Sequence, residues 1–175
     1  MITTEERQLG RAKNAVMFYL ERNLIVPKIY VDANWSGHNV DILAIDRDGV
    51  GDVHVVLTFA SDCPAEGEAL AGYLTDRIDP LVDRVLEIPA QYRYIAAVNL
   101  KDGAPLVLPG LPPELLEKSC SPDGLGRIGF LSIDFSASGE PATRSVFKPE
   151  RFRAKIAKLA DEFVQQHEAD WEIRA

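Results

Sequence analysis

The side chains whose types and spacing could do chemistry gather in the first half of the chain. Three aspartates, Asp46, Asp48 and Asp52, surround Gly49 and superficially resemble a calcium-binding loop. The full D-x-D-x-D-G spacing of such a loop and its closing glutamate are missing, however. Because the stretch is dense in turn-forming residues, we expect the turn of a β-hairpin rather than a cation site.

His54 is a second candidate, because imidazole is a common metal ligand. It stands in an apolar, β-branched run over residues 53–59. A histidine in such a strand is more often a hydrogen-bonded residue, so ligation is the less favoured interpretation. Cys63 and Cys120 are far apart and form no CxxC pair. Their separation favours two reduced thiols over a zinc site or a disulfide framework.

The size and composition suit one α/β domain covering residues 1–175. With 46% hydrophobic residues, the chain can bury a real core. No run approaches the roughly eighteen apolar residues of a membrane span, and the polar start lacks the apolar run of a signal peptide. We therefore expect a cytoplasmic protein that does not enter membranes.

The charge balance argues against nucleic acid as the main partner. The formal net charge is −8, from 19 basic and 27 acidic residues, and phosphate backbones repel a domain of that sign on average. A local basic patch could still exist, although a solvated helix face is the simpler interpretation. The basic cluster near the C-terminus consists of Lys148, Arg151, Arg153, Lys155 and Lys158.

The first half of the chain predicts a helix followed by a hairpin. Apolar residues at helical spacing behind two threonines predict a helix over residues 3–23. A short β-like run follows Pro27, and residues 34–38 are rich in turn formers, where Trp35 is either a partner contact or a packing residue. Two apolar runs, residues 40–45 and 53–59, then predict an antiparallel hairpin.

The second half alternates helix and strand. A helical pattern from about residue 65 is expected to break or kink at Pro80. Residues 92–99 are typical of a central strand, buried on both faces. A proline-rich excursion is expected to follow, then a strand over residues 127–135 with a short partner strand, and a last helix beginning near Pro149. This order predicts a mixed sheet with helices on its faces.

The hairpin carries a likeness to a known family. Residues 39–44 (NVDILA) look like the aspartate strand of the PD-(D/E)xK nucleases, and residues 53–58 (VHVVLT) look like the strand that ends in Glu-x-Lys. A leading helix, an antiparallel hairpin, a helix and a strand are also the family's core order. The chain therefore resembles this superfamily over about its first hundred residues, which implies a restriction-endonuclease-like fold.

The resemblance implies a metal site that this chain does not complete. Family members hold Mg²⁺ with two carboxylates and orient a water molecule with a lysine, all on one side of the strand. Here Val56 and Thr58 stand where Glu and Lys are expected. No carboxylate stands near Lys13 and Asn14, where members of the Gly-Arg-x-x-Glu type place a Glu. Asp41 is the remaining member of the expected set.

Two functional hypotheses follow, together with the possibility of an unrelated α/β domain. The favoured one is a catalytically inactive nuclease-fold domain that acts as a binding or structural module through protein contacts, without a cofactor. The alternative is a nuclease dependent on Mg²⁺ or Mn²⁺ whose acids have migrated to Glu66 or Glu68, working with Asp41 and His54. The simpler interpretation is that Glu66 and Glu68 face solvent in the first turn of a helix, favoured there by the helix dipole.

Overall fold

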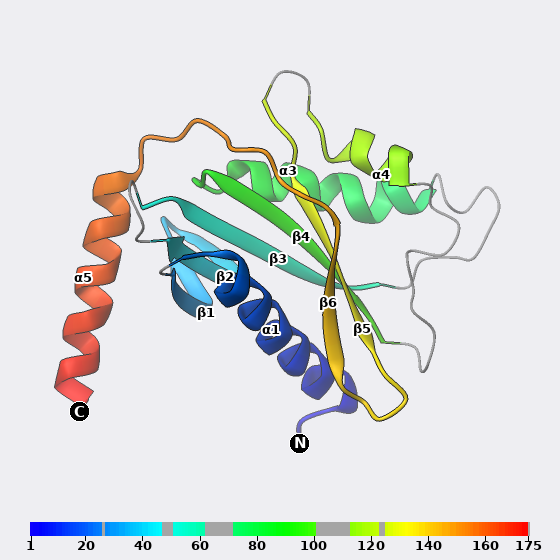
Figure 1. The fold of residues 1–175 in the computed structure, drawn as a ribbon, viewed down its shortest axis with the longest axis horizontal. Coiled ribbons are helices and arrows are strands. Elements are labelled where there is room, and N and C mark those ends of the chain that lie inside the picture. The colour runs from blue at the N-terminus through cyan, green and yellow to red at the C-terminus, as the bar shows by residue number, and fades with distance from the viewer. Residues whose placement is uncertain (26, 47–50, 62–71, 101–112, 123–124, 175) are drawn as a thin grey trace.

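One mixed β-sheet organises the molecule (Figure 1). The computed structural model describes residues 1–25, 27–46, 51–61, 72–100, 113–122 and 125–174, with side chains as far as residue 168. The sheet order is β1-β2-β3-β4-β5-β6. Its strands are β1 (Pro27–Trp35), β2 (His38–Asp46), β3 (Val53–Ser61), β4 (Tyr92–Asn99), β5 (Gly129–Phe135) and β6 (Pro141–Phe147).

The strand directions divide the sheet into three parts. Strands β1, β2 and β3 form an antiparallel meander, β3, β4 and β5 run parallel, and β6 returns antiparallel to β5. The predicted α/β class with a mixed sheet and flanking helices is therefore confirmed, and so is the hairpin of β2 and β3. Strand β4 is buried over most of its length, as expected of a central strand.

Helix α1 (Thr4–Asn23) covers one face of the sheet, and its start was predicted correctly. Thr3 is the N-cap: its hydroxyl accepts a hydrogen bond from the Glu6 amide, and the Thr3 amide donates to the Glu6 carboxylate. The helix buries a stripe of Ala12, Val16 and Leu20 against the sheet. Its apolar face thus fixes the helix across β2 to β5.

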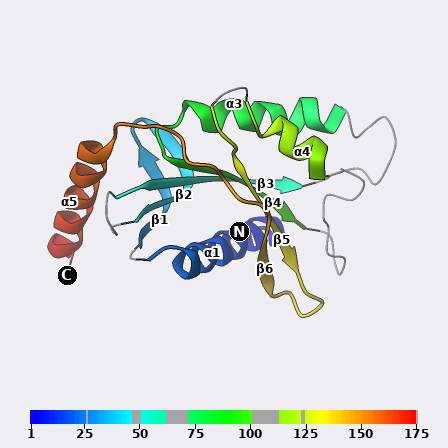
Figure 2. The ribbon, with the colours of Figure 1, turned by 45° about the horizontal axis from the view of Figure 1, so that its top comes forward.

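The opposite face carries η1 (Leu74–Ile78), α3 (Asp79–Glu87) and α4 (Pro113–Ser119), as Figure 2 shows. The helix does not break at Pro80, one of the two expected outcomes, but its geometry changes from π to α just before that residue. A single π turn precedes the proline, with the Asp79 amide donating to the Leu74 carbonyl. Such a turn lets a helix continue past a residue that has no amide hydrogen.

Helix α5 (Ala157–Arg174) starts later than predicted. The expected start near Pro149 is wrong, because the residues before Ala157 pair with other elements. The Phe152 amide donates to the Gln91 carbonyl at 2.7 Å, and the Glu150 amide donates to the Arg127 carbonyl at 2.9 Å. The basic cluster therefore lies mostly on a segment without regular secondary structure, where Arg151 pairs with Asp52 at 2.9 Å, and Lys158 alone of the cluster stands on the helix.

The turn between β1 and β2 is tighter than the sequence suggested. Ser36 and Gly37 both have positive φ, 51° and 80°, as a two-residue hairpin turn requires. Trp35 belongs to β1, is fully buried, and donates its indole N–H to the Pro89 carbonyl at 2.6 Å. Trp35 is therefore a packing residue.

Two further expectations concern thiols and membranes. Cys120 is a buried free cysteine, and burial raises the pKa of its thiol to about 12. Cys63 lies outside the described residues.

Within the part of the chain that the structure describes, no helix combines the length and the apolar character that crossing a membrane requires.

Candidate functional site

The expected motif positions share the face of β3 that α1 covers. His54, Val56 and Thr58 alternate along the strand, so their side chains project to the same side, as predicted. Val56 is fully buried in the core beneath α1. An alkyl side chain in that position offers no ligand atom to a metal or a substrate.

Asp41 lies beside Thr58, at the point where β2 leaves β3. Regular pairing of these strands stops at Ile42 and Val56. Beyond it, the Asp41 carboxylate accepts a hydrogen bond from the Thr58 backbone amide at 2.7 Å. The carboxylate thus satisfies a strand amide that would otherwise lack a partner from the neighbouring strand.

Lys13 completes this site from α1, and it brings in a second carboxylate, that of Asp32. The Lys13 ammonium lies 2.6 Å from Asp32 Oδ1 and 3.4 Å from Asp41 Oδ1. Burial alone lowers the pKa of Lys13, but its hydrogen bond to Asp32 and the charge of Asp41 outweigh that effect and raise the pKa above its ordinary value. A fixed positive charge therefore stands between the two carboxylates.

Asp32 is the member of this site that sequence reasoning missed. It has φ of 51°, and the pairs Val31 with Ile42 and Ala33 with Val40 place it opposite Asp41. The sequence feature that could have indicated the position of Asp32 is the Ser36-Gly37 dipeptide. Recognised as a two-residue turn, it would have paired Trp35 with His38 and hence Asp32 with Asp41.

The donor set around Asp41 does not fit Mg²⁺. That ion prefers several oxygen ligands in octahedral geometry, whereas here an ammonium group holds both carboxylates. Among the described residues, no group of three or more His, Cys, Asp or Glu side chains could hold a metal ion. The alternative acids Glu66 and Glu68 lie outside the described residues.

His54 is not brought next to Asp41. It stands four residues before Thr58 in β3, about 13 Å away at the strand's rise of roughly 3.3 Å per residue. Its Nδ1 lies 3.1 Å from the Tyr94 hydroxyl, and its ring stacks on Tyr92 with centroids 4.6 Å apart. Burial lowers the pKa of His54 to about 4, against the raising effect of Asp46 and Asp52.

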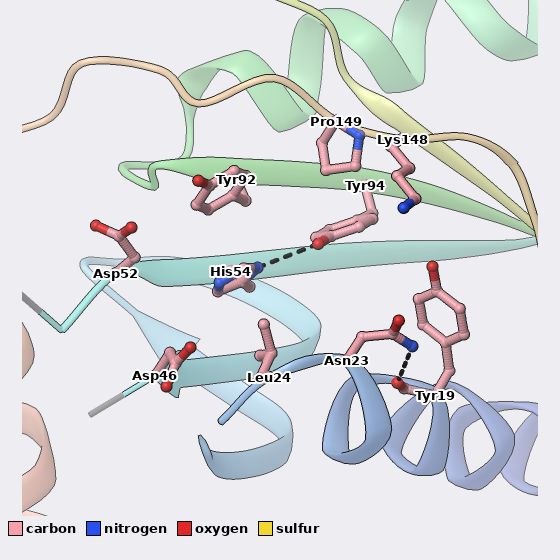
Figure 3. A pocket seen from close by; sticks show the side chains of 10 residues that line it. All are labelled: Tyr19, Asn23, Leu24, Asp46, Asp52, His54, Tyr92, Tyr94, Lys148 and Pro149. Atoms are coloured by element: carbon pink, nitrogen blue, oxygen red, sulfur yellow. Dashed lines mark hydrogen bonds between the residues drawn. The ribbon is translucent and has the colours of Figure 1, made fainter. Parts of the chain in front are cut away.

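His54 instead forms part of a pocket at the other end of the same face, shown in Figure 3. The pocket has a volume of about 290 Å³ and is bounded by the last turn of α1, the first residues of β3 and β4, and Lys148 with Pro149. Asp46 and Asp52 lie at its rim, where the Asp46 amide donates to the Asp52 carbonyl across the hairpin. Asp48 and Gly49 lie outside the described residues.

Comparisons with known proteins identify no family. No protein-family model matches the chain, and no curated protein matches it. A solved structure, an SPO1766 protein of unknown function from Silicibacter pomeroyi, is similar at 14% identity with a TM-score of 0.49. The match covers 94% of this chain and 86% of that protein.

Proposed function

We propose that this chain is a catalytically inactive domain of the PD-(D/E)xK type that acts as a binding or structural module through protein contacts. The observation that carries the proposal is the Lys13 ammonium, which lies within 3.4 Å of Asp41 and closer still to Asp32. Near Lys13 and Asn14, where some family members place an acid, this chain thus supplies a positive charge. An ammonium between the carboxylates replaces the cation on which the family's chemistry depends.

The order of elements supports the family part of this proposal. Helix α1 leads into the antiparallel β1, β2 and β3, and α3 then connects to β4, which runs parallel to β3. The aspartate stands near the start of β2, as in the family's aspartate strand. Two observations support the loss of catalysis. Val56 is buried, and the backbone amide of Thr58 donates a hydrogen bond to Asp41.

Exposed apolar surface beside β6 supports a protein partner. Phe18 on the outer side of α1 is 61% exposed. Two shallow hollows of about 250 and 270 Å³ flank it, and both are lined by Ala15, Phe18 and Pro141. Exposed aromatic side chains beside hollows are typical of protein contacts. The proposal includes a cytoplasmic location, which the buried free thiol of Cys120 supports.

A cleavage assay tests the proposal. The protein is incubated with single- and double-stranded DNA and RNA in the presence of Mg²⁺ or Mn²⁺, beside an Asp41→Asn variant. We expect no cleavage by either protein. Metal-dependent cleavage that disappears in the variant would establish an active nuclease and overturn the proposal.

A further inference from the structure

We infer that the protein partner presents an extended acidic segment, which adds to the outer edge of β6 as a further strand and places its apolar side chains against α1. The inference rests on the proposed function, because it names the kind of protein contact that such a module makes. Strand β6 ends the sheet order, and no described strand pairs with its outer edge. The site is the groove between this edge and α1.

The outer edge of β6 carries backbone groups that another strand can use. At the turn from β5 to β6, the Ser136 amide donates to the Glu140 carbonyl at 2.9 Å, so these two residues form a hydrogen-bonded pair. Hydrogen-bonded and non-hydrogen-bonded pairs alternate along an antiparallel ladder. The backbone groups of Thr143 and Ser145 therefore point away from β5. Within the described part of the chain, no other element hydrogen-bonds to the backbone of either residue.

Helix α1 forms an apolar wall beside this edge (Figure 1). Phe18, on the outer side of the helix, is 61% exposed. The two hollows of about 250 and 270 Å³ lie between the helix and β6, and their lining reaches along the strand from Pro141 to Thr143. Because side chains alternate across a strand, every second residue of an added strand would face these hollows. A strand edge beside an apolar groove is a known arrangement for binding an extended peptide.

The charge of this edge is opposite to that of the chain as a whole. Arg22 lines one hollow and Arg144 is exposed on β6, and neither forms an ion pair with a described residue. Glu140 is the acid among the lining residues, and Arg11 pairs with it at 3.2 Å. Two arginines thus lack a counter-charge, on a chain whose net charge is −8. Complementary charge favours an acidic partner.

Two other occupants fit the edge less well. Arg144 stands at the middle of β6 (Pro141–Phe147), so antiparallel pairing of two copies about that residue would bring two arginine side chains together. Like charges directly opposite each other destabilise a strand pair. A nucleic acid would satisfy the arginines, but it offers neither alkyl side chains for the hollows nor a row of peptide groups for Thr143 and Ser145. An acidic polypeptide provides all three.

Fluorescence anisotropy with a labelled peptide tests the inference. The probe is an acetylated and amidated heptapeptide, as long as β6, that alternates valine and glutamate. We expect it to bind saturably at micromolar concentration, and the same peptide with lysine in place of glutamate to bind at least tenfold more weakly. An absence of binding, equal binding of the lysine peptide, or binding of a single-stranded oligonucleotide in place of the peptide would overturn the inference.

Backbone methylation separates strand pairing from simple charge attraction. One peptide is N-methylated at its valines and a second at its glutamates, so that each loses the amide hydrogens along one of its edges. Because only one edge of the peptide can pair with β6, one methylation should abolish binding and the other should leave it unchanged. Equal effects of the two methylations would show that the backbone is not paired, which contradicts the inference.

Protein variants locate the peptide. Phe18→Ser should weaken binding about tenfold or more, which corresponds to about 1.4 kcal/mol, and Arg22→Gln and Arg144→Gln should each weaken it about two- to fivefold. The matched controls are Ile25→Ser and Arg153→Gln, exposed positions outside both hollows, and they should bind as the parent does. Thermal unfolding verifies that each variant is folded. Parent-like binding by all three groove variants would place the peptide elsewhere and overturn the inference.

Sedimentation of the parent protein examines the second copy as an occupant. We expect a monomer that the peptide leaves monomeric. A dimer that dissociates in Phe18→Ser would assign the edge to another copy of this chain and overturn the inference. The cleavage assay is read separately: a chain that binds the peptide and also cuts nucleic acid would contradict the proposed function, whereas a chain that does neither would contradict only the inference about β6.

Discussion

At the scale of single residues, one lysine decides how Asp41 behaves. Lys13 holds Asp41 and Asp32 together, and the Thr58 amide holds the second oxygen of Asp41. Through these contacts Asp41, in β2, links α1 to β3, which is a structural role. The same carboxylate without the lysine would be a candidate cation ligand.

Removing the Lys13 charge should expose that latent role. In Lys13→Met, the facing carboxylates of Asp32 and Asp41 lose their counter-charge, so the free energy of unfolding should fall by about 1–2 kcal/mol, between the values for exposed and buried ion pairs. Mn²⁺ should then raise the melting temperature of the variant and not that of the parent. Thermal unfolding with and without Mn²⁺ measures both effects.

The control for this prediction is Lys158→Met, because the Lys158 side chain is 92% exposed and its ion pair with Glu162 is long. It should leave stability and the Mn²⁺ response unchanged. Stabilisation of the parent protein by Mn²⁺ to the same degree as Lys13→Met would contradict the view that the ammonium occupies a cation position.

Burial of His54 makes stability depend on pH. Its pKa is about 4 in the folded protein and roughly 6.5 when unfolded, so the unfolded chain binds the proton more readily. Neutral His54 contributes fully to the free energy of unfolding above about pH 6.5. This contribution declines as the pH falls toward about 4, by at most about 3 kcal/mol. In His54→Phe, which keeps an aromatic ring on Tyr92, urea unfolding should show a flatter decline across that window. An identical slope in parent and variant would refute the assignment.

At the scale of elements, two glycines give opposite predictions for one substitution. A Cβ at Gly129 would lie 2.7 Å from Pro149 Cδ and 3.0 Å from Tyr94, whereas at Gly10 in α1 it would meet nothing within 4 Å. Gly129→Ala should therefore lower the free energy of unfolding by about 1–3 kcal/mol. Gly10→Ala should raise it by about 0.5–1 kcal/mol. Chemical denaturation compares the two, and equal effects would mean that Pro149 moves aside freely.

Local patterns were enough to predict the elements whose own residues determine them. The N-cap at Thr3 and the apolar runs of β2 and β3 are encoded within a few residues, and the start of α1 and the hairpin were both predicted correctly. The segment before α5 was not, because Gln91 and Arg127, distant in sequence, provide its hydrogen-bond partners. The helix continues past Pro80 through a π turn, and no local pattern of residues indicated that turn.

In the candidate site, too, local patterns predicted some features, and contacts between distant residues determined the others. His54, Val56 and Thr58 could be placed on one face of their strand from periodicity alone. The contact between Lys13 and Asp32 joins α1 to β1. It could not be predicted locally, because it depends on where the helix crosses the sheet. The pocket around His54 depends on four separate parts of the chain, from Tyr19 to Pro149, so no single stretch of sequence indicated it.

At the scale of the whole molecule, the surface beside β6 is where a partner should bind. Strand β6 is an edge of the sheet, and the outer side of α1 runs next to it with Phe18 exposed. The opposite edge, β1, is packed by α5, where Tyr30 and Trp35 contact Phe163. With a net charge of −8, the chain meets a protein surface at lower electrostatic cost than a nucleic acid.

Phe18→Ser tests this surface without disturbing the fold. Because the side chain is 61% exposed, its loss should change the free energy of unfolding by no more than about 0.5 kcal/mol. A partner captured by the parent protein from extracts of its own cells should be lost with Phe18→Ser, since a central aromatic contact contributes about 2 kcal/mol or more. Ile25→Ser is the matched control, because Ile25 is 73% exposed and lies outside both hollows. Retention of the partner by Phe18→Ser, or its loss from both variants alike, would place the contact elsewhere on the molecule.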